Sequence, residues 1–231
     1  MTSSPETANQ RTIDIETDDA TLEATLHLVD EPAGLVVFPD GIGAGQLRSR
    51  NWFVAGVVRE AGFATLVVDL LTEDQKPLGA SDQSPEFDVE QLADRLVGVL
   101  DWLETDDDVR HLDVGLFGAS LGATAALLAA ARRPDIVDGL VCRGARSDLA
   151  GDELAKIEAP TLLLVGSNDF RVIELNEKAL DELGADDTRM GLISGASHLF
   201  SEPGTLQRAA ELGADWLQRH ISPSASAASA P

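Results

Sequence analysis

The sequence predicts a single α/β domain in which a mostly parallel sheet carries helices on both faces. Two observations support this prediction. Short continuous apolar runs alternate along the chain with longer segments whose apolar residues recur at helical spacing. The chain also has 231 residues, 44% of them hydrophobic, a length that suits one such domain and would be cramped for two. We expect the domain to occupy residues 11–221.

The first elements are predicted to be edge strands. Residues 12–16 and 22–28 alternate between apolar and polar side chains. A period of two is typical of half-buried antiparallel strands. These two segments therefore predict an antiparallel edge of the sheet.

The strands that follow are predicted to be buried on both faces, because a short continuous apolar run is typical of the interior of a parallel sheet. Such runs occupy residues 34–38, 64–68, 112–117, 139–142, 161–165 and 190–193. Helical patterns separate them at residues 51–60, 89–103, 121–133, 172–183 and 205–219. The alternation of the two patterns predicts helices that cross over between parallel strands.

The two ends of the chain are predicted to lie outside the folded domain. Residues 1–10 are polar, so we expect a flexible N-terminus and no signal peptide. Residues 222–231 contain only Ser, Ala and Pro, which predicts a disordered tail. No apolar run approaches the ~18 residues that a membrane span needs. We therefore expect a cytoplasmic protein.

The charge of the chain is strongly negative, with 40 Asp and Glu against 17 Lys and Arg and a formal net charge of −23. Binding to nucleic acid or to an anionic membrane is not expected, because both need a basic face. An acidic disordered interaction protein is the other interpretation, but the hydrophobic content and clear periodicity argue against it. At ~1 M salt the screening length falls to about 3 Å, so repulsion between surface carboxylates is weak. We interpret the composition as adaptation to high salt, in a halophilic source.

No cofactor and no metal are expected. The single cysteine, Cys142, cannot form an internal disulfide, and the four histidines are far apart in the sequence. Cys142 ends a predicted strand, where a buried core residue is the simplest interpretation.

A candidate nucleophile lies between a predicted buried strand and a predicted apolar helix. Residues 118–122 read Gly-Ala-Ser-Leu-Gly and fit the pattern G-x-S-x-G. In this strand–turn–helix context the serine projects above the sheet at the start of the helix. Ser120 is therefore the predicted nucleophile, and the backbone N–H of Leu121 is the predicted oxyanion donor. The alternative is an ordinary turn in which Ser120 only caps the helix.

The base and the acid that a serine nucleophile needs have candidates further along the chain. Asp169 follows the predicted strand at 161–165, and His198 follows the last predicted strand. Both loops lie at carboxyl ends of strands, where the sites of open α/β sheets gather. We predict that His198 takes the proton of Ser120 and that Asp169 orients His198. Asp69, after the strand at 64–68, is a rival acid.

The loop at residues 39–45 is predicted to supply the second oxyanion donor, because it follows the first central strand. Its glycines allow close approach of the backbone, and the N–H of Ile42 is the preferred donor. A phosphate-binding loop is a weak alternative, because neither G-K-[ST] nor G-x-G-x-x-G spacing is present.

Taken together, these segments resemble the dienelactone-hydrolase-like branch of the α/β-hydrolases, and in particular small serine hydrolase domains that sometimes occur fused to phosphoribosyltransferases. The resemblance runs from about residue 34 to residue 220. The stretches that carry it are residues 40–43, 49–51, 68–72, 118–122, 143–149, 159–166 and 198–204. It implies an α/β-hydrolase fold with an eight-stranded, mostly parallel sheet, and the triad Ser120, Asp169 and His198.

The chain departs from its relatives at two positions. Dienelactone hydrolases proper use a cysteine nucleophile where this chain has Ser120, so we expect a substrate other than dienelactone. Relatives commonly carry histidine where this chain has Asp40. A carboxylate beside a developing oxyanion is unfavourable unless it is turned away or paired, and Arg48 and Arg50 are the candidates to pair with it.

The segment from 143 to 157 is short, so no cap domain is expected over the site, and small soluble esters or lactones are the expected substrates. Arg143 and Arg146 follow a strand end near the site and are candidates to bind a substrate carboxylate as a planar fork. The simpler interpretation is that they pair with local acids such as Asp148 or Asp152. The predicted activity is therefore that of a serine esterase of the dienelactone-hydrolase type.

Two other functions are kept open beside it: an acyltransferase, and a non-catalytic or regulatory protein of the same fold with a phosphoribosyltransferase as partner. Product analysis with competing alcohols would distinguish the first from a hydrolase, and labelling by a serine-directed phosphonate would distinguish the second. A homodimer is a possible oligomeric state that the sequence does not decide.

Overall fold

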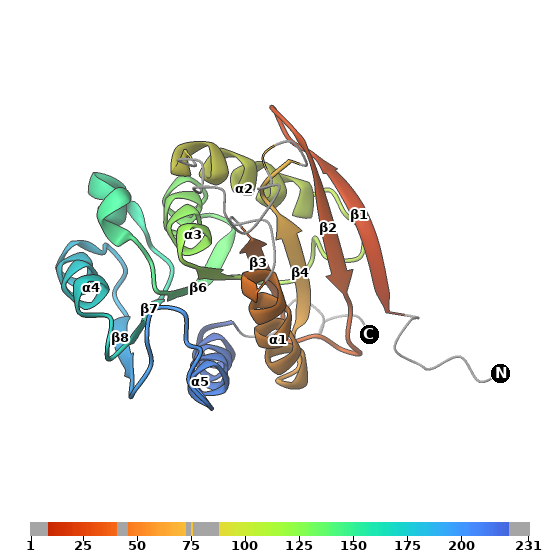
Figure 1. The fold of residues 1–231 in the computed structure, drawn as a ribbon. Coiled ribbons are helices and arrows are strands. Elements are labelled where there is room, and N and C mark those ends of the chain that lie inside the picture. Colours follow the sequence, from red (N-terminus) through yellow and green to blue (C-terminus); the bar gives the residue numbers. More distant parts are fainter. Residues whose placement is uncertain (1–8, 41–45, 73–74, 76–87, 222–231) are drawn as a thin grey trace.

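The computed structural model describes residues 9–40, 46–72, 75 and 88–221, with the side chains of residues 46–48 excepted. Within these residues the strands form one eight-stranded sheet in the order β1-β2-β4-β3-β5-β6-β7-β8 (Figure 1). The strands are β1 (Gln10–Glu16), β2 (Thr21–His27), β3 (Leu35–Asp40), β4 (Ala64–Asp69), β5 (Val114–Ala119), β6 (Val137–Arg143), β7 (Thr161–Gly166) and β8 (Thr188–Ile193).

The sheet is mixed but mostly parallel. β1 pairs with β2, and β2 with β4, in antiparallel register, whereas the strands from β4 to β8 in the sheet order are all parallel. The alternating patterns at 12–16 and 22–28 do form the antiparallel edge. The carboxyl ends of the parallel strands meet at one edge of the sheet, where the predicted site residues lie.

Helices cover both faces of the sheet (Figure 1). α1 (Gln46–Glu60) and α5 (Thr205–His220) pack on one face. α2 (Val89–Leu103), α3 (Leu121–Arg132) and α4 (Phe170–Glu182) pack on the other. The side chains of each strand alternate between these two layers. In β3, for example, Val37 joins the core beneath α2 and α3, whereas Val36 and Phe38 join the core beneath α1 and α5. Continuous apolar runs are needed because both faces of these strands are buried.

Several elements begin or end away from their predicted bounds. β5 starts at Val114 rather than at residue 112, because Leu112 N donates to Val109 O in a turn and Val114 N donates to the Asp138 carboxylate. The strand ends at Ala119, directly before Ser120. α1 begins at Gln46, five residues before the predicted start. The predicted flexible N-terminus (all but its last two residues) and the predicted tail at 222–231 lie outside the described residues.

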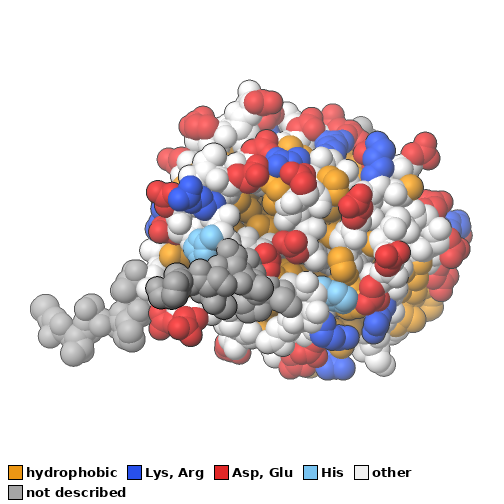
Figure 2. Space-filling model, turned by 180° about the vertical axis from the view of Figure 1, so that it is seen from behind, with side chains coloured by type: hydrophobic (Ala, Val, Ile, Leu, Met, Phe, Trp, Pro, Cys, Tyr) orange, Lys and Arg blue, Asp and Glu red, His pale blue; other side chains and the backbone are white. Residues whose placement is uncertain are grey.

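Between β6 and β7 the chain forms only two short 3-10 helices, η2 (Ser147–Leu149) and η3 (Gly151–Lys156). No further domain is inserted in this described segment. Among the described residues, no helix is both long and apolar enough to span a membrane. On the face that Figure 2 shows, acidic side chains are spread over the visible described surface rather than gathered in one place.

Candidate active site

Ser120 lies in a strained turn between β5 and α3. Its backbone angles are φ 52° and ψ −121°, and a positive φ is unfavourable for a residue with a side chain. Backbone hydrogen bonds hold it there: Ser120 N donates to Arg143 O at 2.9 Å, and Ser120 O accepts from Ala123 N at 3.0 Å. The Ser120 side chain makes no capping hydrogen bond to the helix. The alternative of a merely capping serine therefore does not describe this turn.

The tightness of the turn explains the glycine at position 118. A Cβ atom on Gly118 would lie 2.4 Å from Ala123 Cα and 2.6 Å from Gly122 O. Because both neighbours are backbone atoms, they could not move aside without moving the start of α3. The glycine therefore lets β5 and α3 approach closely enough to project Ser120 from the edge of the sheet.

Asp169 and His198 form a hydrogen-bonded pair. Asp169 lies between β7 and α4, His198 lies between β8 and α5, and His198 Nδ1 is 2.7 Å from Asp169 Oδ2. The Asp169 side chain is 15% exposed and that of His198 is 41% exposed. Because an ionised carboxylate can only accept, Nδ1 carries the proton in this pair. In the neutral ring Nε2 is then free to accept a proton.

Backbone and side-chain hydrogen bonds fasten the two loops to each other. Asn168 N donates to Ala196 O and Asn168 Nδ2 donates to Gly195 O, both at 3.0 Å. Gly195 N donates to Ser167 Oγ at 2.8 Å. These hydrogen bonds hold the backbones that carry Asp169 and His198 next to each other.

Two further residues support His198, and neither was singled out from the sequence. Gly144, with φ +62°, lies against the His198 ring, because a Cβ there would be 3.4 Å from His198 Cε1. Glu202 accepts a hydrogen bond from Ser197 N at 3.0 Å. The hydrogen bonds from Ser197 lower the pKa of Glu202. The only signal in the sequence is that both residues lie in stretches that carry the family resemblance.

Residues 143 and 144 connect Ser120 to His198. Arg143 O accepts from Ser120 N, and the next residue, Gly144, contacts the ring of His198. Among the described residues there is no hydrogen bond between Ser120 and His198. Catalytic hydrogen bonds of free enzymes are often long and tighten only when substrate binds. The arrangement thus brings Ser120, His198 and Asp169 to one edge of the sheet, with His198 and Asp169 already hydrogen-bonded to each other.

The rival acid, Asp69, lies elsewhere. It ends β4, in register with Asp40 at the end of β3, and its carboxylate accepts from Leu71 N at 3.1 Å. β4 and β7 are separated by three strands in the sheet, so Asp69 is far along the edge from Asp169.

Of the two predicted oxyanion donors, the structure describes only Leu121. Leu121 is the first residue of α3, so its N–H has no acceptor within the helix. Ile42 lies outside the described residues, as does the side chain of Arg48. Asp40 is 4% exposed at the end of β3, and its backbone O accepts from Leu70 N.

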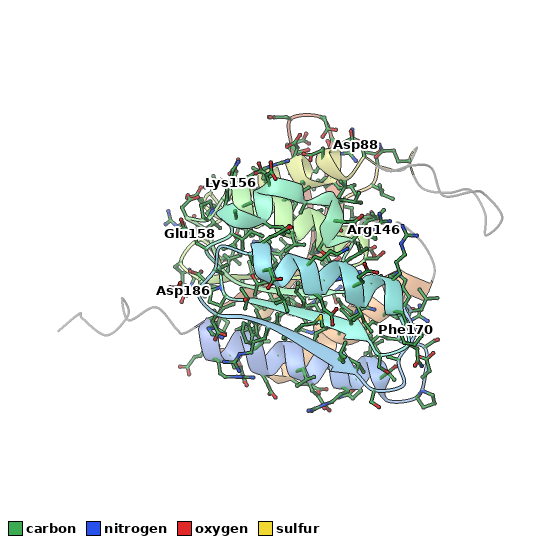
Figure 3. The ribbon with its side chains drawn as sticks, turned by 90° about the vertical axis from the view of Figure 1, so that its left-hand side faces the viewer. Asp88, Arg146, Lys156, Glu158, Phe170 and Asp186 are labelled. Carbon is green, nitrogen blue, oxygen red and sulfur yellow. The ribbon has the colours of Figure 1, made fainter. Side chains whose placement is uncertain are left out.

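The two arginines that were predicted to follow the strand end have different environments. Arg146 pairs with Asp148, with Nε and Nη2 at 2.8 Å and 2.7 Å from the two carboxylate oxygens. Arg143 is only 3% exposed, and its guanidinium lies over the Phe200 ring, 5.1 Å from the centroid. Burial, with a smaller contribution from nearby Arg50, lowers the pKa of Arg143 to about 10. Figure 3 shows Arg146 at the same end of the molecule as Phe170, which follows Asp169.

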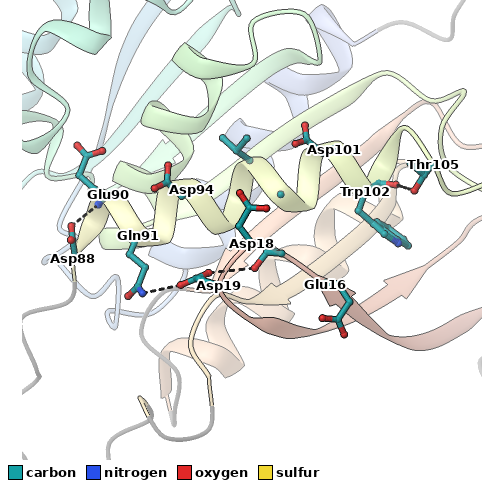
Figure 4. Close-up of a pocket in the computed structure, with 13 residues that line it drawn as sticks. Glu16, Asp18, Asp19, Asp88, Glu90, Gln91, Asp94, Asp101, Trp102 and Thr105 are labelled. Atoms are coloured by element: carbon teal, nitrogen blue, oxygen red, sulfur yellow. Dashed lines mark hydrogen bonds between the residues drawn. The ribbon is translucent and has the colours of Figure 1, made fainter.

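Other chemistry finds little support among the described residues. No group of three or more His, Cys, Asp or Glu side chains there could hold a metal ion. Cys142 is fully buried, its Sγ donates to Ala123 O, and burial raises the pKa of its thiol. A groove of about 930 Å³ runs between the β1–β2 turn and α2, but carboxylates such as Asp18, Asp94 and Asp101 line it and no histidine does (Figure 4).

Known proteins resemble the chain in sequence and in fold. Residues 22–222 match the model of the dienelactone hydrolase family. A crystal structure of a dienelactone hydrolase from Anabaena variabilis is 42% identical, with a TM-score of 0.86 over 92% of this chain and 98% of that one. Est1E from Butyrivibrio proteoclasticus, at 18% identity, shares the fold with a TM-score of 0.74 over 91% of this chain and 98% of that one.

Curated relatives include longer proteins. A Mycobacterium tuberculosis protein that is named a phosphoribosyl transferase is 45% identical over 196 residues, which are 85% of this chain and 43% of that protein. The chain thus spans less than half the length of this relative. A Bradyrhizobium protein named 2-oxo-3-(5-oxofuran-2-ylidene)propanoate lactonase is 29% identical over 64% of this chain and 66% of its own length.

Proposed function

The chain belongs to the dienelactone hydrolase family, and from that premise we propose that it is a serine hydrolase that cleaves small esters or lactones through an acyl-enzyme on Ser120. One observation carries the proposal above the others. Ser120 is held at a positive φ with a side chain that makes no capping hydrogen bond to α3, at the sheet edge where His198 Nδ1 and Asp169 Oδ2 lie 2.7 Å apart. Strained turns of this kind cluster at active sites, where the strain positions a reacting group.

The proposed reaction has two steps. Ser120 Oγ attacks the carbonyl carbon while His198 Nε2 takes its proton, and the amides of Leu121 and Ile42 bind the oxyanion. The carbonyl then reforms, and the leaving alkoxide takes the proton from His198. In the second step His198 removes a proton from water, the hydroxide attacks the acyl-enzyme, and the acid is released as Ser120 regains its proton. Asp169 keeps the proton on Nδ1 throughout and stabilises the charged imidazole.

The substrate class is inferred from the short segment between β6 and β7 and from relatives. No cap domain is inserted in the described segment between β6 and β7. We therefore expect small soluble substrates rather than substrates that need an enclosing cap. The Bradyrhizobium relative is named a lactonase, and Est1E has been crystallised with ferulic acid bound. A lactone differs from an ester only in that the leaving alcohol stays attached, so the same machinery serves both.

The proposal is tested by labelling the protein with a fluorophosphonate probe. The buffer contains about 2 M KCl, because a screening length below ~3 Å weakens the repulsion between carboxylates that opposes the folded state. Mass spectrometry should find the label on Ser120. The variants Ser120→Ala and His198→Ala should not be labelled, and both should stay folded by circular dichroism. Folded wild-type protein that takes up no label would reject the serine mechanism and favour a non-catalytic or regulatory role. Label together with transfer of the acyl group to an added alcohol in preference to water would favour an acyltransferase.

A further inference from the structure

Residues 143–147 follow β6 and contact both the proposed nucleophile and the proposed base. Arg143 O accepts from Ser120 N at 2.9 Å. The next residue, Gly144, turns the chain with φ +62°, and a Cβ there would be 3.4 Å from Cε1 and 3.6 Å from Nδ1 of His198. The backbone of this segment therefore lies against the two residues between which the proposed reaction moves a proton.

The rest of the segment is bound to α4, the helix that begins directly after Asp169. Asn176 Nδ2 donates to Ala145 O at 3.0 Å, and Ser147 Oγ donates to Leu175 O at 3.1 Å. Asn176 is fully buried and Ser147 is 1% exposed. Such hydrogen bonds are costly to break, because a buried group that loses its partner stays unsatisfied. The segment is thus fixed to the helix that carries the proposed acid at its start.

Thr124 binds the same segment from α3, the helix that follows the nucleophile. Its Oγ1 donates to Ser120 O at 3.3 Å, the usual bond of a helical threonine to the carbonyl four residues earlier. The same Oγ1 accepts from Arg146 N at 3.2 Å, and this bond crosses to another element. Thr124 is fully buried, and the other side chains that α3 buries are apolar. One hydroxyl therefore joins the turn at Ser120 to the segment that supports His198.

These contacts connect all three members of the proposed triad through one segment of backbone. We propose that Thr124 and Asn176 are positioning residues, which hold residues 143–147 in place and so align Ser120 Oγ with Nε2 of His198. Both act through the segment and not on the substrate. The proposal rests on the proposed function, because it concerns the proton transfer on which that function depends.

The segment should control the distance between Ser120 and His198 rather than the basicity of His198. The pair of His198 and Asp169 has its own support, because hydrogen bonds join the two loops that carry it. The connection from Ser120 to that pair runs through residues 143–147. A shift of the reacting groups by ~1 Å can cost roughly a hundredfold in rate. We therefore expect loss of either positioning residue to lower kcat, with little change in KM and in the pKa of His198.

The rate of labelling by a fluorophosphonate probe, which needs an activated serine, measures this alignment. Thr124→Val keeps the shape of the side chain and removes the hydroxyl. We expect the labelling rate and kcat for an activated ester to fall by about tenfold to a hundredfold. The amount of label bound at completion, KM and the acidic midpoint of the pH profile of kcat/KM should stay near their wild-type values. Thr124→Ser, which keeps the hydroxyl, should restore most of the rate.

Thr161→Val is the matched control for the loss of a buried hydroxyl. Thr161 is as buried as Thr124, and its Oγ1 donates to Ala159 O at 2.8 Å. It begins β7, so it lies at the opposite edge of the sheet from the site. The change should destabilise the protein in urea to a similar extent and leave the labelling rate unaltered. A purely structural role of Thr124 would lower the amount of labelled protein in both variants and leave the rate per folded molecule at the wild-type value.

Asn176→Leu releases the same segment from α4 and covers the case in which Thr124→Val does not fold. The side chain keeps its size and loses the donor to Ala145 O. Its labelling rate should fall in the same direction. The double variant should lose less than the product of the two single losses, because both residues hold one segment. Rates at the wild-type value in both single variants, or an equal fall in Thr161→Val, would overturn the proposal.

The behaviour of wild-type protein separates this proposal from the proposed function. Folded wild-type protein that takes up no label rejects the serine mechanism and the alignment with it. Wild-type protein that is labelled, at a rate that Thr124→Val and Asn176→Leu share, keeps the hydrolase and rejects only the positioning role.

Discussion

Asp169 Oδ2 and His198 Nδ1 lie 2.7 Å apart, although 29 residues separate them in the chain. Each residue stands in a loop after a strand, and β7 and β8 are neighbours in the sheet. The loops are joined by the hydrogen bonds of Asn168 to residues 195 and 196. The pair is thus already formed in the unliganded protein. Because Asp169 contacts Nδ1, the other ring nitrogen of His198, Nε2, is not used in this pair.

Replacement of the acid should damage turnover while the fold survives. In Asp169→Asn the side-chain amide can donate a hydrogen bond to Nδ1 of His198. The proton of the neutral ring can then lie on Nε2, which leaves Nε2 unable to accept the proton of Ser120. We expect kcat for an activated ester to fall by roughly 10³–10⁴-fold with a small change in KM. Asp186→Asn makes the same chemical change at the opposite end of the molecule, as Figure 3 shows, and should leave kcat unaltered. A loss below tenfold in Asp169→Asn would assign the acid to another residue.

A methyl group at position 118 should destabilise the protein. In Gly118→Ala the new Cβ would be 2.4 Å from Ala123 Cα, so β5 and α3 must separate. We expect the free energy of unfolding in urea to drop by about 1–3 kcal/mol or more. Gly56→Ala is the matched control, because the nearest atom to a Cβ there is the end of the Arg59 side chain at 3.7 Å. In helix α1 that change should stabilise by about 0.5–1 kcal/mol. Equal effects of the two changes would contradict the close packing at Ser120.

The pair between Asp19 and Arg95 should make stability depend on pH. Hydrogen bonding to Arg95 lowers the pKa of Asp19 from 3.8. A carboxylate whose pKa is lowered by folding stabilises the protein above its unfolded pKa, and that stabilisation is lost as the pH falls through the folded pKa. Asp19→Asn should therefore lower the free energy of unfolding by ~1 kcal/mol at pH 7, since Asp19 is partly exposed. The difference from wild type should vanish well below pH 3.8.

The adjacent carboxylate supplies the control for this experiment. Asp18→Asn removes the same charge one residue away, whereas the carboxylate that Arg95 contacts is that of Asp19. Denaturant titrations of wild type and both variants at pH 7 and at acidic pH give the comparison. A pH-independent loss in Asp19→Asn, or the same loss in Asp18→Asn, would show that net charge and not the Arg95 contact decides the effect.

Salt should stabilise the folded chain. With a formal net charge of −23, repulsion between surface carboxylates opposes the compact state in dilute buffer. We expect Tm to rise by at least ~5 °C between low salt and ~1 M KCl, over which the screening length falls to about 3 Å. Most of the rise should come below ~1 M, because screening acts there, whereas exclusion of salt from the surface acts mainly above it. An equally high Tm without salt would reject adaptation to high salt.

The sequence by itself determined which segments become strands and helices, where the strained serine stands, and which loops carry Asp169 and His198. These features depend on hydrophobic spacing and turn residues, which are properties of neighbouring positions in the chain. Only the tertiary structure decided the sheet order, which separates Asp69 from β7 and brings Asp169 against His198. It also distinguished Arg146, which pairs with Asp148, from Arg143, whose Nε and Nη2 atoms have no hydrogen-bond partner among the described residues. Two arginines three positions apart look alike in sequence, and they differ because Arg146 is partly exposed beside Asp148 whereas Arg143 is buried against Phe200, a residue far along the chain.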